Sequence, residues 1–287
     1  MSSQPRVTFV GIGAIGLPMA QQLASNGFAV TGVDPIAFQH ERASSAGIHP
    51  VSAVFEAPHA PSVVVMVATP DQLEGLVTTA LDKTDVAGQT WVIMSTVGPN
   101  AVREQASRLQ SAGATVVDAP VTGGVARAMT GTLTIFAAGS ADGIDGVAEL
   151  LAHLGTVRRV GAELGQGQAI KVVNQHLCSI HIVAAAEALN LAGSLGLDEA
   201  EVLDLIGTGA AGSWMLGDRG PRMLQGTDVE VTSTINIFVK DSSLVAAAAR
   251  KSGADTPLLD VAKHRYEQAL ELGLATRDDS RVIETYR

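Results

Sequence analysis

Cysteine, aromatic residues and positive charge are all scarce in this chain, and each scarcity excludes a kind of protein. Cys178 is the one cysteine among 287 residues, so no disulfide can form within the chain and no thiolate cluster can hold a metal. Aromatic residues make up 3% and the formal net charge is -10, which argues against a nucleic-acid partner. The lack of disulfides fits a reducing compartment, so we expect a cytoplasmic protein.

Long apolar runs and two familiar catalytic patterns are also missing. No stretch reaches the ~18 uninterrupted apolar residues of a membrane span, so no membrane partner is predicted. The first residues lead directly into a predicted strand, which predicts no signal peptide. The seven histidines lack zinc-type spacing, and no G-x-S-x-G sequence occurs, so we expect neither a metal site nor a serine hydrolase.

Small and apolar residues are abundant instead. The chain contains 30 glycines and 46% hydrophobic residues, enough for one large or two medium domains with a substantial core. Through the first half, apolar runs alternate with helical patterns such as those at 70–79 and 99–112. The runs predicted as strands are 7–10, 28–33, 62–67, 91–94, 115–118, 132–138 and 157–160. This alternation is typical of an α/β domain with a parallel, doubly wound sheet.

The pattern changes near residue 165, after which no convincing strand occurs. Nothing breaks a helix between 167 and 195, and further helices are predicted at 198–207, 235–252 and 257–273. We therefore predict a Rossmann-like domain over residues 1–164, a fold that commonly binds dinucleotides such as NAD. A long helix joins it to an all-α domain over residues 165–287, which would serve substrate binding and dimerisation.

A glycine-rich turn between the first strand and the first helix points to a dinucleotide. Its residues are Gly11, Ile12, Gly13, Ala14, Ile15 and Gly16. In such a G-x-G-x-x-G turn the first glycine permits a tight turn, the second lets a pyrophosphate approach the backbone, and the third allows close helix packing. Asp34 ends the second strand, where a carboxylate accepts hydrogen bonds from the ribose hydroxyls and repels a 2′-phosphate, so NAD is favoured over NADP. The alternative is an ordinary glycine-rich turn.

Three further motifs carry polar groups that could act on a substrate. Thr122, Gly123 and Gly124 follow a strand and offer a hydroxyl and consecutive N–H groups to a carboxylate, although a plain glycine turn is the alternative. Lys171, Asn174 and Gln175 share one face of the long helix, with Lys171 set among apolar neighbours near the helix start. Lys240 precedes Asp241 in a later helix, a pattern that is often only a solvated surface pair.

Together these motifs resemble those of the β-hydroxyacid dehydrogenase family, which contains 3-hydroxyisobutyrate dehydrogenase, tartronate semialdehyde reductase and, more distantly, 6-phosphogluconate dehydrogenase. The resemblance runs from Val7 past Asp241, with the motifs in the family's order. It implies that the glycine turn and Asp34 hold NAD and that Lys171 is the catalytic lysine. The residues that it implies beside the nicotinamide are Val67, Ala68, Thr69 and Thr96.

The same resemblance assigns the substrate and a second lysine. It implies that Thr122, Gly123 and Gly124 hold the substrate carboxylate and that Lys240 reaches over the cofactor or substrate. Gln175 stands where most relatives have asparagine, which indicates a different subfamily. Together with segments 210–215 and 278–280, Gln175 resembles the L-threonate dehydrogenase branch, whose members oxidise four-carbon sugar acids.

The sequence therefore predicts NAD-dependent oxidation of a small hydroxy acid. The cofactor would accept a hydride, while Lys171 acts as general acid/base and Asn174 and Gln175 contact the substrate. Two alternatives stay open: an imine reductase, whose relatives replace the lysine, and a non-catalytic dinucleotide-binding module. Because amphipathic helices need apolar partners, we expect a homodimer or homotetramer.

Overall fold

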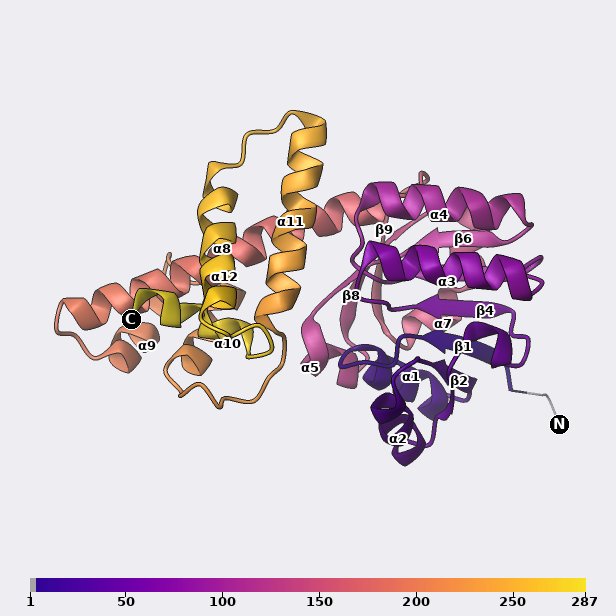
Figure 1. The fold of residues 1–287 in the computed structure, drawn as a ribbon, viewed down its shortest axis with the longest axis horizontal. Coiled ribbons are helices and arrows are strands. Elements are labelled where there is room, and N and C mark those ends of the chain that lie inside the picture. The colour runs from indigo at the N-terminus through magenta and orange to yellow at the C-terminus, as the bar shows by residue number, and fades with distance from the viewer. Residues whose placement is uncertain (1–3) are drawn as a thin grey trace. The chain divides into compact units, whose positions relative to one another are not determined.

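The computed structural model describes residues 4–287, and the chain divides into two compact units (Figure 1). The first unit extends to Lys171 and the second covers Val172–Arg287. The division falls inside the long helix α8 (Gln166–Ser194), after the position at which the sequence pattern changes. The first turn of α8 thus belongs structurally to the first unit.

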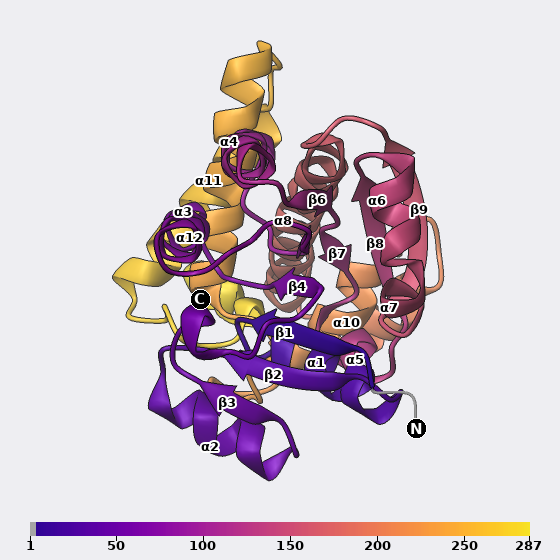
Figure 2. The same cartoon turned by 90° about the vertical axis from the view of Figure 1, so that its right-hand side faces the viewer.

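A twisted sheet forms the centre of the first unit (Figure 2). Its strands are β1 (Arg6–Val10), β2 (Ala29–Val33), β3 (His49–Val51), β4 (Ser62–Val65), β5 (Thr90–Ile93), β6 (Thr115–Asp118), β7 (Val121–Thr122), β8 (Leu133–Ala138) and β9 (Gly155–Gly161). They lie in the order β3-β2-β1-β4-β5-β6-β8-β7, and β9 pairs with β8. The pairs from β3 to β6 are parallel, so the doubly wound sheet expected from the sequence is confirmed for this part.

The far edge of the sheet departs from a purely parallel arrangement. β8 runs antiparallel to both β6 and β7, and β9 then runs parallel to β8. The reversal arises because the chain turns back after β7 through a single short helix, α5 (Gly124–Met129), rather than through a full crossover. Sequence periodicity could not reveal this direction, since a buried strand reads alike in both orientations.

Helices cover both faces of this sheet (Figure 2). They are α1 (Gly16–Ser25), α2 (Ala37–Ser45), the 3-10 turn η1 (Val54–Glu56), α3 (Pro70–Lys83), α4 (Pro99–Ser111), α6 (Ala141–Gly146) and α7 (Ala148–Ala152). Successive strand residues serve opposite faces: Val92 joins the core under α1, α6 and α7, whereas Trp91 and Ile93 join the core under α3 and α4. Burial on both faces explains why these strands read as continuous apolar runs.

The second unit is helical, as the sequence predicts. After α8 it contains α9 (Glu199–Gly207), α10 (Trp214–Met223), α11 (Ile235–Ser252), α12 (Pro257–Glu271) and the 3-10 segment η2 (Asp279–Tyr286). Its core includes Tyr266, which stacks on Phe238 with ring centroids 5.3 Å apart and donates a 2.9 Å hydrogen bond to the Ser179 carbonyl. Among the described residues, extended pairing here is limited to one bridge between Thr234 and Asp278.

By length and composition alone, helix α8 is long and apolar enough to cross a membrane, since its most apolar 18 residues have a mean hydropathy of 1.3. Its inward residues Ile182, Ala186 and Leu189 are fully buried in the core of the second unit. Such packing is typical of the central helix of a globular domain.

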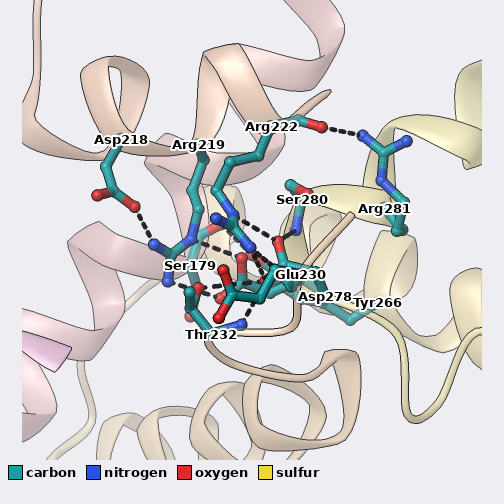
Figure 3. A network of polar contacts seen from close by, with 11 residues as sticks. Ser179, Asp218, Arg219, Arg222, Glu230, Thr232, Tyr266, Asp278, Ser280 and Arg281 are labelled. Atoms are coloured by element: carbon teal, nitrogen blue, oxygen red, sulfur yellow. Dashed lines mark hydrogen bonds and ion pairs between the residues drawn. The ribbon is translucent and has the colours of Figure 1, made fainter. Parts of the chain in front are cut away.

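Buried ion pairs tie the C-terminal segment to α10 (Figure 3). Arg219 makes a bidentate ion pair with Asp279, with hydrogen bonds of 2.6 and 3.0 Å. Arg222 pairs with Asp278 in the same bidentate way, at 3.2 and 2.9 Å. Burial raises the pKa of Asp279 to about 6, against the opposing effect of Arg219. Burial acts in the same direction on Asp278, but hydrogen bonds from Arg222 and from the Thr232 N–H hold the pKa of that carboxyl at about 2.

Candidate active site

The carboxyl ends of β1, β4, β5 and β6 meet at one edge of the sheet, because these neighbouring strands are parallel. From β1 the chain forms β2 and β3 on one side and then crosses to β4 on the other side of β1, so the strand order reverses between β1 and β4. Ligands of open α/β sheets bind in the crevice at such a switch point. Most of the predicted cofactor residues follow these strand ends, whereas Asp34 follows β2 and Lys240 lies on α11 in the second unit.

The glycine turn after β1 has the shape that a dinucleotide requires. Gly11 has a φ of +87°, and a Cβ there would lie 2.4 Å from the Met66 carbonyl oxygen. A Cβ on Gly16 would lie 1.9 Å from the Gly11 carbonyl oxygen, so helix α1 packs directly against the turn. A Cβ on Gly13, by contrast, would meet nothing within 4 Å. The fold itself requires Gly11 and Gly16, whereas the open space at Gly13 is what a pyrophosphate would occupy.

The start of α1 suits an anion. Its N-cap Ile15 makes no side-chain cap, and its first turn contains no acidic residue. No side chain of the helix's own first turn therefore neutralises its positive end. Asp34 lies beside it and is 7% exposed, with its two oxygens accepting hydrogen bonds from the N–H groups of Ile12 at 3.2 Å and Ile36 at 3.0 Å. These residues fit NAD, since they combine an anion site with a fixed carboxylate for the ribose.

The loops after β4 and β5 are held by side-chain hydrogen bonds. Thr69 caps α3 by accepting a 3.2 Å bond from the Gln72 N–H, and the Gln72 side chain accepts bonds from the N–H groups of Ala68 and Thr69. Val67 precedes this capping box, and Thr96 lies in the loop after β5. The structure thus brings these four predicted residues to the same edge as the glycine turn.

The turn after β7 requires both of its glycines. Thr122 pairs with Thr134 of β8, and the chain then passes through Gly123 with a φ of +136° and Gly124 with a φ of +67°. A Cβ on Gly123 would lie 2.7 Å from the side chain of Arg127. The two glycines add no side chains of their own to this turn, whose consecutive N–H groups could bind a carboxylate.

Asp118 and Gln168 are two buried polar residues at this edge of the sheet that the sequence analysis did not single out. Asp118 ends β6 and is fully buried, and its Oδ2 atom accepts hydrogen bonds from the N–H groups of Gly165 at 2.8 Å and Gln168 at 3.1 Å. Burial raises the pKa of Asp118 to about 6, although these hydrogen bonds act to lower it. The position of Asp118 at a predicted strand end, directly before the Thr122 turn, was the available signal.

Lys171 lies on α8, one helical turn beyond Gln168, and is only 7% exposed. A lysine is rarely so buried unless its amine has a role or a partner. The sequence prediction that this lysine is shielded is consistent with its burial, and the residue belongs to the same compact unit as the glycine turn and Thr122.

The remaining predicted residues form a polar chain within the second unit. Asn174 donates a 2.9 Å hydrogen bond to the Gln175 side-chain oxygen, and the Gln175 amide nitrogen donates to Asp241. Lys240 lies 2.8 Å from the other oxygen of Asp241. The extra methylene of Gln175 is thus used to reach Asp241, and Lys240 is not a simple solvated charge. Among residues 4–287 no group of three metal-ligating side chains occurs.

A glycine-rich turn at the switch point, a hydrogen-bonded carboxylate beside it and a buried lysine are the features expected of an NAD-binding oxidoreductase. The family described as the NAD-binding domain of 6-phosphogluconate dehydrogenase matches residues 6–166. The one described as NAD-binding of NADP-dependent 3-hydroxyisobutyrate dehydrogenase matches residues 165–286. The chain belongs to the β-hydroxyacid dehydrogenase family, as an NAD-dependent enzyme of the 3-hydroxyisobutyrate dehydrogenase type.

Individual relatives agree with this assignment over almost the whole chain. An L-threonate dehydrogenase from Cupriavidus necator is 34% identical, covering 96% of this chain and 94% of the relative. A crystal structure of 3-hydroxyisobutyrate dehydrogenase from Salmonella typhimurium has a TM-score of 0.89 at 28% identity, covering 98% of this chain and 100% of its own. The Mycobacterium tuberculosis 3-hydroxyisobutyrate dehydrogenase, solved with L-serine, has a TM-score of 0.86 at 27% identity and covers 99% of each chain.

Proposed function

We propose that this enzyme oxidises a four-carbon sugar acid of the L-threonate type, with Lys171 as the general acid/base. The observation that carries the proposal is the placement of a buried lysine on a helix whose first turn is hydrogen-bonded to the strand end that leads into Thr122. Similarity to L-threonate dehydrogenases supports the substrate class. A 3-hydroxyisobutyrate-type acid is the second candidate, supported by the structural neighbours.

In this proposal, different residues bind the substrate carboxylate and transfer the proton. Bound NAD supplies the hydride acceptor. Thr122, Gly123 and Gly124 bind the substrate carboxylate through one hydroxyl and two N–H groups, which fixes the orientation of the carbon to be oxidised. Lys171 removes the proton from the substrate hydroxyl as the C–H bond breaks, and it returns that proton to the oxygen in the reverse direction. The family resemblance assigns Lys240 to the cofactor or substrate.

The amide groups of Asn174 and Gln175 serve the substrate hydroxyls in this proposal. Both follow Lys171 on α8, and Gln175 is held by Asp241 through its amide nitrogen. A fixed amide is a better specificity element than a mobile one, because it loses less conformational entropy on binding. A sugar acid, which carries several hydroxyl groups, can use such fixed amides more fully than 3-hydroxyisobutyrate can.

Replacing the lysine tests the central assignment. We expect Lys171→Ala to lower kcat by about 10²- to 10⁴-fold, the usual contribution of a positioned general acid/base, while NAD binding persists. Lys83→Ala is the matched control, because Lys83 ends α3 at the opposite edge of the sheet. Turnover can be followed as NADH absorbance and NAD binding by calorimetry. Near-normal turnover of Lys171→Ala would contradict the assignment.

A substrate panel separates the proposed activity from its alternatives. The panel contains L-threonate, D-erythronate, glycerate, 3-hydroxyisobutyrate and L-serine, each assayed with NAD. We expect the highest kcat/KM with L-threonate. Tight NAD binding without turnover of any acid would instead favour a non-catalytic binding module, and NADH-dependent reduction of imines alone would favour an imine reductase.

The preference for NAD over NADP depends on Asp34 in this proposal. Its buried carboxylate would repel a 2′-phosphate, so Asp34→Asn is expected to raise kcat/KM with NADP relative to NAD by at least about tenfold, the effect of roughly 1.4 kcal/mol. An unchanged ratio would show that other residues determine the preference. We further propose a homodimer or homotetramer in the cytoplasm, which light scattering and cell fractionation would test.

A further inference from the structure

One glutamine side chain joins three parts of the edge where the candidate site lies. Gln168 is fully buried in the first turn of α8. Its side-chain oxygen accepts hydrogen bonds from the N–H groups of Val97 at 3.0 Å and Gly98 at 2.9 Å. Its nitrogen donates to the Ser95 carbonyl at 2.8 Å and to Asp118 at 3.2 Å. Both lone pairs and both N–H groups of this amide are therefore used.

These contacts allow only one orientation of the amide. A flipped amide would place its NH₂ group against two N–H donors and its oxygen against two acceptors, losing every hydrogen bond at a buried site. The chain between Ser95 and Gly98 includes Thr96, one of the predicted cofactor residues. Gln168 thus fixes both this loop after β5 and the first turn of α8 with the same side chain.

Asp118 completes the anchor from the end of β6. Its carboxylate accepts hydrogen bonds from the N–H groups of Gly165 and Gln168. It therefore caps the N-terminus of α8 from the end of strand β6. A Cβ on Gly167 would lie 2.5 Å from the Phe136 carbonyl oxygen and 3.0 Å from the Asp118 side chain. The helix start therefore lies in direct contact with the sheet, without room for adjustment.

We propose that Gln168 and Asp118 are positioning residues that set the place of Lys171 relative to the Thr96 loop. Lys171 lies one helical turn beyond Gln168, so a shift or rotation of the first turn moves its amine directly. Displacements near 1 Å are enough to lower the rate of a positioned reaction by about 10²-fold. The inference rests on the proposed function, since it assumes that Lys171 is the catalytic group.

The test compares Gln168→Glu with Gln168→Leu between pH 6 and pH 9. Glutamate keeps the acceptor for Val97 and Gly98, but when ionised it has no proton to give to Ser95 or Asp118. We expect kcat at pH 8 to fall about 10- to 100-fold in both variants, with KM and NAD affinity changed by less than about threefold.

The pH profile distinguishes positioning from a general loss of packing. Two adjacent buried carboxyl groups share one proton, so the pair retains it well above the ordinary pKa of an aspartic acid. As the pH falls toward 6, the ratio of Gln168→Glu kcat to wild-type kcat is expected to rise by at least about fivefold, because the shared proton restores a donor to Asp118. Gln168→Leu is expected to show no such recovery.

Gln89→Glu is the matched control. Gln89 is a buried glutamine of the same unit that bonds to the Ala60 carbonyl and Trp91, at the opposite edge of the sheet. We expect this control to lower the melting temperature while kcat stays within about twofold of wild type. If Gln168→Leu does not fold, Gln168→Met replaces it, because methionine conserves the side-chain length without the hydrogen bonds.

Two outcomes would overturn the positioning role. One is a Gln168→Glu enzyme with wild-type kcat at pH 8, and the other is a loss of kcat whose ratio to wild type does not change with pH. Either result with an inactive Lys171→Ala enzyme would reject only the positioning role. An active Lys171→Ala enzyme would reject the proposed function itself.

Discussion

Each unit of this enzyme buries an aspartate whose pKa is raised to about 6, but the two carboxyl groups have different surroundings. Asp118 in the first unit is surrounded by backbone N–H groups and the Gln168 amide. Asp279 in the second unit faces the guanidinium of Arg219. Neutral donors orient a helix start and a loop without introducing a second charge, whereas the ion pair attaches the C-terminal segment to α10. Burial of an acid therefore does not by itself identify a functional site.

Breaking the ion pair should have the largest effect on stability. Arg219→Met leaves Asp279 buried without its counter-charge, which typically costs about 3–5 kcal/mol of unfolding free energy. Urea denaturation followed by circular dichroism measures this loss. The double variant Arg219→Met with Asp279→Leu removes both charges and should recover most of it. A single variant that loses less than about 1 kcal/mol would contradict the view that this pair attaches the C-terminal segment to α10.

The pH dependence of stability should reveal the titration of Asp118, the buried aspartate of the first unit. The folded-state pKa of Asp118, about 6, lies above its ordinary value of 3.8, so the folded protein keeps a proton that the unfolded chain releases. The resulting stabilisation is present below pH ~4 and is lost as the pH rises through ~6. Relative to Asp118→Asn, the wild type should lose roughly 2–3 kcal/mol of unfolding free energy between pH 4 and pH 7. Parallel urea titrations of both proteins test this, and a constant difference would contradict it.

An exposed ion pair provides the smallest expected effect and calibrates the first prediction. Arg277 and Asp228 lie 3.0 Å apart with side chains 47% and 91% exposed. Because water screens such a pair, Arg277→Met should cost less than about 1 kcal/mol in the same urea measurement. A loss comparable to that of Arg219→Met would show that burial does not separate the two pairs.

Local patterns predicted much of the fold. The predicted helix at 235–252 coincides with α11, and the strand at 115–118 coincides with β6, since both have strong periodicity and clear ends. Several short elements were not predicted, among them β3, β7 and α10. β3 and β7 have too few residues to show a period, and α10 contains Pro221 within the helix, which local rules disfavour.

The residues of the candidate site were also only partly identifiable from the sequence. The residues Gly11, Gly13 and Gly16 were readable because their spacing is local and each has a separate physical reason. Asp118 and Gln168 were not identified, because their meaning depends on a contact between positions far apart in the chain. The sequence analysis marked Gln175 as unusual, but only the folded second unit, which contains this part of α8 and α11, shows its bond to Asp241.

By itself the sequence determined the alternating α/β half, the helical half, the dinucleotide turn and the lysine on the long helix. These features depend on periodicity and on the properties of glycine, which act over a few neighbouring residues. The tertiary structure decided the direction of β8, the buried ion pairs of the second unit and the amide that joins β5, β6 and α8. Such features arise from burial and from hydrogen bonds that must be satisfied away from water, and only the folded chain brings their partners together.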